Sequence, residues 1–185
     1  MELTVPARPR LEPSWRGGGC PGMAYFYNAF FVIALAFFSS DAHSEEWVES
    51  SDQGFGFTYL VPADTFVPAA GEDKPSMYGF KSRDGDAKLM FSAWNNKEGR
   101  SPDGFKRWLL ANTEGYDELT YRPRGRSWFV LSGYRNDNIY YEKVMFSCGG
   151  DVVNVFAMSY PERQRHRYDQ MVERIEDHFR PGKGC

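Results

Sequence analysis

The side chains that could carry out covalent or metal chemistry are few and widely spaced. Beyond residue 44 the sequence contains two cysteines, Cys148 and Cys185, and two histidines, His166 and His178. The histidines are twelve positions apart in a predicted helix, about 120° from each other around its axis, so they cannot share a metal ion. We expect both to face solvent. The sequence predicts no metal site and no cofactor.

Three other short motifs could suggest catalysis or ion binding, and each is incomplete. Ser132 in "VLSGY" lacks the glycine two residues earlier that a nucleophile elbow requires. The segment 83–88, "RDGDAK", has the first acidic pair of a calcium loop but not the later ligands, and it suits a hairpin turn better. Cys148 could act as a nucleophile if the fold brought a histidine beside it. No catalytic residue is predicted.

Distances along the chain predict a disulfide bridge between Cys148 and Cys185. A strand from the turn after Cys148 to Tyr160 travels about 30 Å. A helix over 162–179 then covers about 27 Å, and it returns toward Cys148 if it runs antiparallel to that strand. The last six residues can reach about 20 Å further. The alternative is two unpaired thiols, with Cys148 in the core.

The first 44 residues have the pattern of a secretory signal. Residues 24–38 are apolar or aromatic except for one asparagine and carry no charge. A helix of this length spans only about 22 Å, less than a bilayer requires, and it suits the apolar region of a signal peptide. Ala42 and Ser44 then occupy the −3 and −1 positions of a cleavage site before Glu45. The alternative is an uncleaved anchor that tethers the protein to the membrane.

We therefore expect an N-terminal arm and signal peptide over 1–44, cleaved after Ser44, and one domain over 45–185. Translation could start at Met1 or at Met23, which directly precedes the apolar segment. The expected location is periplasmic or secreted, with membrane attachment only through an uncleaved signal. The net charge of −3 and the pI near 5.7 argue against a nucleic-acid partner.

The elements expected beyond residue 44 are strands and two helices. Apolar alternation, turn residues and capping residues predict strands over 54–62, 76–82, 86–94, 117–123, 126–135, 138–148 and 151–160, and helices over 101–113 and 162–179. Residues 45–53 read as an irregular polar lead-in, and 63–75 as a loop.

Phe105, Trp108 and Leu109 form the expected apolar stripe of the first helix. The final helix has one apolar face, formed by Tyr168, Met171, Val172, Ile175 and Phe179. Its opposite face reads as a solvated surface of mixed charge, formed by Arg163, Arg165, Arg167, Glu173, Arg174 and Glu176.

This order predicts an α+β fold with a mostly antiparallel sheet of about six to seven strands and two helices. Three segments carry a family resemblance: "GFGFTYLVPADTF" (54–66), "NIYYEKVMFSCGGDVVNVFAMSYP" (138–161) and "YDQMVERIEDHF" (168–179). With them the sequence resembles the PsbP/Mog1-like superfamily of α/β/α sandwiches over residues 54–180, and it is similar to small exported bacterial proteins of this shape. The resemblance implies an accessory or partner-binding role and transfers no catalytic or ligand motif.

Several aromatic residues could form a partner surface, because aromatic rings give contact area at a low cost in conformational entropy. The candidates are Trp94 with Asn95, Trp128, Tyr134 and Tyr141, and the alternative for each is packing on the sheet. The resulting hypothesis is an exported, non-catalytic accessory or partner-binding module of the bacterial cell envelope. The alternatives are a small secreted hydrolase with a site assembled from sequence-distant residues, and a membrane-tethered structural protein.

Overall fold

The computed structural model describes residues 45–69, 74–113, 115–183 and 185, so the expected signal peptide and its cleavage site lie outside the described residues. Within the described residues the fold is α+β, as predicted. The strands are β1 (Trp47–Ser51), β2 (Thr58–Pro62), β3 (Phe66–Pro68), β4 (Met77–Ser82), β5 (Lys88–Asn95), β6 (Glu118–Tyr121), β7 (Trp128–Arg135), β8 (Asn138–Ser147) and β9 (Val152–Pro161). The helices are α1 (Pro102–Asn112) and α2 (Arg165–His178), with short 3-10 turns at Cys148–Gly150 and Glu162–Gln164.

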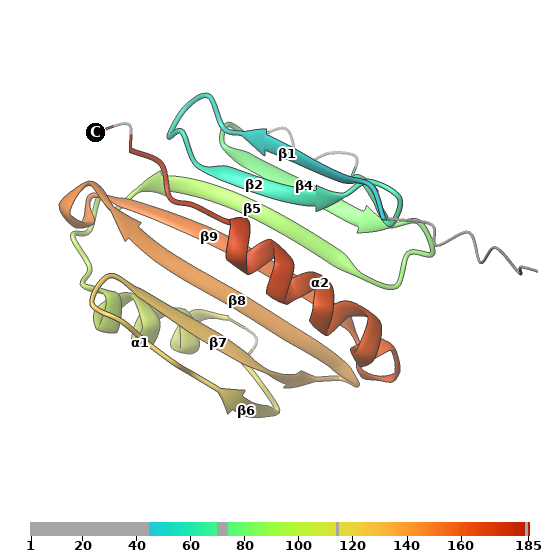
Figure 1. The fold of residues 1–185 in the computed structure, drawn as a ribbon. Helices are drawn as coiled ribbons and strands as arrows, with labels where there is room; N and C mark the ends of the chain where they lie inside the picture. Colours follow the sequence, from blue (N-terminus) through green and yellow to red (C-terminus); the bar gives the residue numbers. More distant parts are fainter. Residues whose placement is uncertain (1–44, 70–73, 114, 184) are drawn as a thin grey trace, which may run out of the picture. The chain divides into compact units, whose positions relative to one another are not determined.

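Seven of these strands form one antiparallel sheet in the order β3-β4-β5-β9-β8-β7-β6, and β1 and β2 form a separate hairpin. In the β7–β8–β9 meander, β7 joins β8 through a two-residue turn, and β8 joins β9 through residues 148–151, which include a 3-10 turn. Asn136 and Asp137 link β7 to β8 with positive φ values of 49° and 61°, as a two-residue hairpin turn of this type requires. The sheet is covered on both faces, with α2 and the β1–β2 hairpin on one side and α1 on the other (Figure 1).

The larger core lies between the sheet and the layer made by α2 and the β1–β2 hairpin. Aromatic rings run through it in contact, with centroid distances of 4.5 Å from Tyr59 to Phe91 and 5.5 Å from Phe91 to Phe156. The predicted apolar face of the final helix is confirmed, because all five of its residues are buried here. Such a face stabilises the helix through burial of apolar area more than through its intrinsic propensity.

The smaller core lies under α1. The Ser101 side chain caps this helix by accepting a hydrogen bond from the Gly104 amide at 3.2 Å, as its sequence indicates. Phe105 and Leu109 are buried against strands β7, β8 and β9. Trp108, the third residue of the predicted stripe, remains 39% exposed. The short helix covers only part of this face of the sheet.

Two segments that read as irregular contain strands. Residues 47–51 form β1, which pairs along its whole length with β2, and residues 66–68 form β3 at the edge of the sheet. The turn between β1 and β2 is fastened by Asp52, which is only 4% exposed. Its carboxylate accepts hydrogen bonds from the Phe55 amide, the Ser76 hydroxyl and the Tyr78 hydroxyl. β1 is ordered by its pairing with β2, and β3 by its pairing with β4. Local composition does not reveal such pairing, so neither strand was predicted.

The predicted bridge between Cys148 and Cys185 is present. The chain after α2 returns to the β8–β9 turn, as the length argument requires, and Arg180 pairs with Thr58 through two backbone hydrogen bonds of 3.0 and 3.1 Å. A Cβ atom at Gly182 would lie 1.6 Å from the Phe55 carbonyl oxygen, so only glycine fits at this crossing. Neither α-helix in the described part of the chain combines the length and apolar character needed to cross a membrane.

Candidate functional site

A cleft of about 450 Å³ lies between α2 and the strands at one end of the sheet. Helix α2 packs on β9 and β8, and the sheet continues past it into β7 and β6 (Figure 1). The cleft forms where the side of the helix meets this uncovered sheet surface. Its lining includes Gly133 and Ile139 from the sheet and Val172 from α2.

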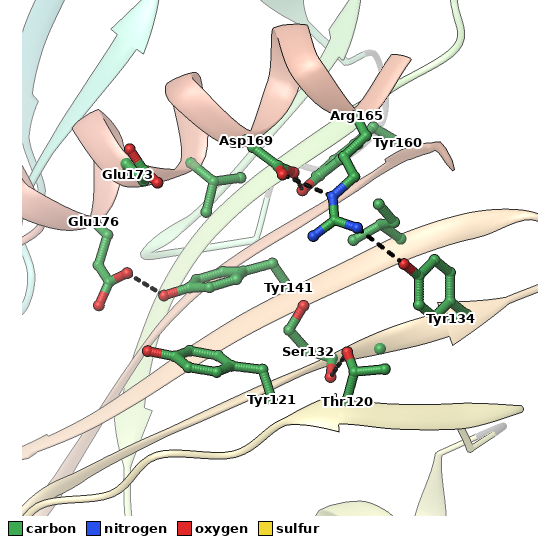
Figure 2. Close-up of a pocket in the computed structure, with 13 residues that line it drawn as sticks. Thr120, Tyr121, Ser132, Tyr134, Tyr141, Tyr160, Arg165, Asp169, Glu173 and Glu176 are labelled. Atoms are coloured by element: carbon green, nitrogen blue, oxygen red, sulfur yellow. Dashed lines mark hydrogen bonds and ion pairs between the residues drawn. The ribbon is translucent and has the colours of Figure 1, made fainter. Parts of the chain in front are cut away.

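The four strands at this end of the sheet contribute one tyrosine each to the cleft. These are Tyr160 from β9, Tyr141 from β8, Tyr134 from β7 and Tyr121 from β6. Strand alternation places them on the face that α2 covers. We call the hollow that they line the tyrosine cleft. Figure 2 shows the four rings facing the helix, and Tyr121 is the most open of them, at 54% exposed.

The facing side of α2 contributes a stripe of charged residues. Arg165, Asp169, Glu173 and Glu176 follow one another at spacings of four, four and three residues, so they lie along one side of the helix. The apolar face next to this stripe holds α2 against the sheet, which directs the charged side chains toward the tyrosines (Figure 2).

A first hydrogen-bond network closes one end of the tyrosine cleft. The Tyr160 hydroxyl donates to Asp169 at 2.7 Å, and Arg165 donates to the other oxygen of the same carboxylate at 2.9 Å. Arg165 also donates to the Tyr134 hydroxyl oxygen at 3.2 Å. Burial raises the pKa of Tyr160, and its hydrogen bond to Asp169 raises that pKa further. The phenol therefore stays protonated and acts as a donor.

A second network closes the other end. The Tyr141 hydroxyl donates to Glu176, and Lys143 donates to the second oxygen of that carboxylate at 2.9 Å. Burial, followed by the hydrogen bond to Glu176, raises the pKa of Tyr141. A phenol that keeps its proton at neutral pH cannot serve as a general base. The two networks hold the orientations of the Tyr134, Tyr141 and Tyr160 rings, which suits a surface organised for binding.

The exposed part of the cleft is acidic and aromatic. Its lining contains three carboxylates, from Asp169, Glu173 and Glu176, and a single cationic group, from Arg165. Glu173 is exposed and makes no hydrogen bond or ion pair with any described residue. Tyr121 presents an open ring on the strand side of the cleft (Figure 2). Carboxylates beside aromatic faces are groups to which lysine and arginine side chains bind.

The structure brings together only part of the predicted aromatic surface. Tyr134 and Tyr141 both line the tyrosine cleft. Trp128 packs half-buried on the same face of the sheet, with its ring 6.0 Å from the Lys143 amine. Trp94 and Asn95 lie at the end of β5, where the Trp94 ring is 6.1 Å from that of Phe105 in α1, on the opposite face. These five residues therefore do not form one continuous surface.

Sequence reasoning missed most of the residues that complete the cleft. Tyr121 and Tyr160 were not among the predicted surface residues, and Arg165 and Glu176 were expected on a merely solvated helix face. Arg165 is exposed as expected and Glu176 is partly buried, and both also make hydrogen bonds with tyrosines. The regular spacing of Arg165, Asp169, Glu173 and Glu176 beside the apolar face was the available signal, because it predicts one charged stripe next to the sheet.

The residues considered for catalysis do not assemble in the cleft. His166 and His178 are exposed on α2 and do not line it, and the ring of His178 lies 2.8 Å from the Arg174 carbonyl oxygen. Cys148 is held in the disulfide, so its thiolate is not free to attack. Among the described residues, no group of three or more histidine, cysteine, aspartate or glutamate side chains is placed to hold a metal ion.

Comparisons with known proteins identify the fold. The sequence matches no protein-family model and no curated protein. The structure is similar to the solution structure of cyanobacterial PsbP from Synechocystis sp. PCC 6803, with a TM-score of 0.53, 12% identity, and coverage of 76% of this chain and 95% of that one. It is similar to the Ran-binding protein Mog1p of Saccharomyces cerevisiae, with a TM-score of 0.54, 12% identity, and coverage of 75% and 96%. The chain thus has a PsbP/Mog1-like fold, as its sequence predicts.

Proposed function

We propose that this protein is an exported, non-catalytic accessory module of the bacterial cell envelope that binds a protein partner through the tyrosine cleft. The observation that carries the proposal is the arrangement of the cleft itself. Four tyrosines from four adjacent strands face one charged stripe of α2, and two hydrogen-bond networks fix three of the rings, those of Tyr134, Tyr141 and Tyr160. Rigid aromatic contact area of this kind is typical of binding surfaces.

The chemistry of the cleft favours a partner segment that carries lysine or arginine. Glu173 offers an exposed carboxylate without an internal partner among the described residues, and Tyr121 offers an open aromatic face. A cationic side chain placed between them would gain an ion pair and a cation–π contact together. Arg165 and Lys143 are already engaged with Asp169 and Glu176, so they do not compensate the charge of Glu173.

Export is supported by the disulfide and by the contacts that Glu45 and Glu46 make with the domain. A bridge between Cys148 and Cys185 persists in oxidising compartments such as the periplasm. Glu45 and Glu46, the first residues after the predicted cleavage site, already take part in the fold. The Thr65 hydroxyl donates to the Glu45 carboxylate at 3.0 Å, and the Glu46 amide donates to Asp64 at 2.9 Å. These contacts fit a mature domain that begins at Glu45.

The shared fold supplies a precedent for a protein partner. The Saccharomyces cerevisiae chain of this fold is a Ran-binding protein, so the same scaffold serves protein recognition elsewhere. The fold alone does not determine the partner, because recognition depends on the side chains of the site. The acidic tyrosine cleft is the feature of this chain from which the partner's chemistry is inferred.

The proposal is tested by comparing capture from an envelope fraction by three forms of the mature domain. We expect the unchanged protein and the control Glu49→Lys to retain the same envelope protein. We expect Tyr121→Ala/Glu173→Lys to lose it, because the variant removes the open ring and reverses the free charge. Glu49 is exposed on β1, away from the cleft, so the control makes the same charge reversal elsewhere. Equal retention by all three forms would refute the proposed surface.

A further inference from the structure

The opposite face of the sheet contains a second hollow, of about 410 Å³, which we call the sheet groove. Helix α1 covers this face where it packs on Phe129, Val144 and Val155, and the neighbouring part of the face is left open. The groove lies in that open part, over strands β4, β5, β9 and β8. It is separated from the tyrosine cleft by the thickness of the sheet.

Strand register fixes the layout of the sheet groove in two rows across the sheet. One row runs through paired positions from Lys81 to Lys88, Ser159 and Tyr140. The adjacent row runs in the same direction through Gly79, Met90, Ala157 and Glu142. The β9 positions of the two rows, Ser159 and Ala157, have small side chains and leave the depression, while longer side chains flank them on β5 (Lys88 and Met90) and on β8 (Tyr140 and Glu142).

The two ends of the sheet groove carry opposite charges. Lys81 and Lys88 are exposed at one end of the groove. Glu142 lies at the other end and is partly buried. The carboxylate of Glu142 makes no hydrogen bond or ion pair with any residue that the structure describes. Burial raises the pKa of this group to about 7. A desolvated carboxylate of this kind gains from a cationic partner supplied from outside.

The spacing between these ends defines the size of a complementary molecule. Two strand intervals, about 10 Å across the sheet, separate Lys88 on β5 from Glu142 on β8, and Lys81 on β4 lies one interval further out. An extended tripeptide spans about 10 Å between its termini. It carries a carboxylate at one end, an ammonium group at the other and apolar side chains between them. Met90 and Ala157 supply apolar surface between the charged ends of the groove, and Tyr140 adds an aromatic ring on β8, the strand that carries Glu142.

We propose that the sheet groove binds a short peptide with free termini, about three residues long. Its carboxylate lies at Lys81 and Lys88, its ammonium group lies at Glu142, and its apolar side chains cover Met90 and Ala157. Tyr141 borders both hollows, but the residues assigned to the peptide lie on the opposite face of the sheet and do not line the tyrosine cleft, so the site can be tested independently of the proposed function.

The test titrates the purified protein with the tripeptide alanyl-leucyl-alanine and follows the backbone amide signals of Gly79 and Ala157 by NMR. We expect saturable shifts at these amides. We expect acetylation of the amino terminus and amidation of the carboxyl terminus each to weaken binding by about tenfold, because each removes one charge-assisted contact. The absence of saturable shifts at millimolar peptide would overturn the proposal.

Two variants test which residues of the groove bind each terminus of the peptide. In Glu142→Gln, acetylating the peptide should no longer weaken binding, because the group that recognises the ammonium is gone, while amidation should keep its effect. In Lys81→Gln/Lys88→Gln, amidating the peptide should no longer weaken binding, while acetylation should keep its effect. Glu162→Gln, which neutralises an exposed carboxylate outside the groove, should respond to both modifications as the unchanged protein does. If acetylation weakened binding equally in Glu142→Gln and in the unchanged protein, the assigned orientation would be wrong and the proposal would fall.

Discussion

Cys148, at the β8–β9 turn, and Cys185 are joined in a disulfide with their Cα atoms 5.4 Å apart, although 37 positions separate them along the chain. The bridge encloses β9 and α2, the two elements that carry Tyr160, Arg165 and Asp169. It also holds the tail against β2, where Arg180 pairs with Thr58. The covalent link therefore secures the helix that forms one wall of the tyrosine cleft.

Removal of the bridge should lower stability substantially. For a loop of this length we expect Cys148→Ser/Cys185→Ser to lose about 4 kcal/mol in the free energy of unfolding, because the unfolded chain regains loop entropy. Urea unfolding of the variant and of the oxidised protein measures the difference. Reduction of the unchanged protein should reproduce the loss. Equal stability of the oxidised and reduced forms would show that the bridge does not support the fold.

Asp52 should contribute stability that depends on its charge. Burial alone raises the pKa of Asp52, but hydrogen bonds from Phe55, Tyr78 and Ser76 outweigh burial and hold that pKa below its ordinary value of 3.8. The contribution is therefore present above pH 3.8 and is lost as the pH falls through the lowered pKa.

We expect Asp52→Asn to lose about 2 kcal/mol in the free energy of unfolding at pH 7, and less below pH 3. Urea unfolding at the two pH values measures this change. The matched control Asp151→Asn replaces an exposed aspartate and should differ little from the unchanged protein. A deficit in Asp52→Asn that stayed constant with pH would show that its carboxylate charge does not matter.

The contribution of Glu142 to stability should depend on pH in the opposite sense to that of Asp52. Its pKa in the folded protein, about 7, lies above the ordinary value of 4.5 because the group is buried. Its favourable contribution is complete below pH 4.5 and is lost as the pH rises through 7. We expect Glu142→Gln to match the unchanged protein near pH 4.5 and to exceed it at pH 8 by up to about 3 kcal/mol. Thermal unfolding across this range measures the gap, and a gap independent of pH would contradict the shifted pKa.

The hydrogen bond from Tyr141 to Glu176 should be worth more than that from Arg165 to Tyr134. Tyr141 is buried and donates to a carboxylate, so Tyr141→Phe should cost about 2 kcal/mol in unfolding free energy. Tyr134→Phe removes an acceptor from an exposed arginine and should cost about 0.5 kcal/mol or less. A double-mutant cycle that combines Tyr141→Phe with Glu176→Gln isolates the first bond. Coupling near zero would show that the bond contributes nothing.

Most strands and both helices could be predicted because the spacing of apolar residues along the sequence indicates them. Tyr168, Met171, Val172 and Ile175 recur at helical spacing, and all four are buried as expected. Strand β1 could not be predicted in this way, since "WVESS" has weak strand character and is ordered by pairing with β2. For the same reason β3, at the edge of the sheet, was read as part of a loop.

The site was predictable only in part. Tyr134 and Tyr141 were identified as aromatic residues on strands, but their partners Arg165 and Glu176 are 31 and 35 positions away. Only the register of β7, β8 and β9 and the docking of α2 bring these groups together. The bridge between Cys148 and Cys185 was predictable despite its long separation, because the lengths of β9 and α2, together with an antiparallel helix, determine where the chain returns.

The tyrosine cleft as a protein-binding surface is tested most directly by site-specific cross-linking. A photoreactive phenylalanine analogue at position 121 lies on the open rim of the cleft, and the same group at position 49 lies on β1, outside it. After irradiation in intact envelopes, we expect a discrete cross-linked protein from position 121 and none from position 49, with the product lost when Glu173→Lys is added. Equal cross-linking from both positions, or a product unaffected by Glu173→Lys, would contradict binding at this surface.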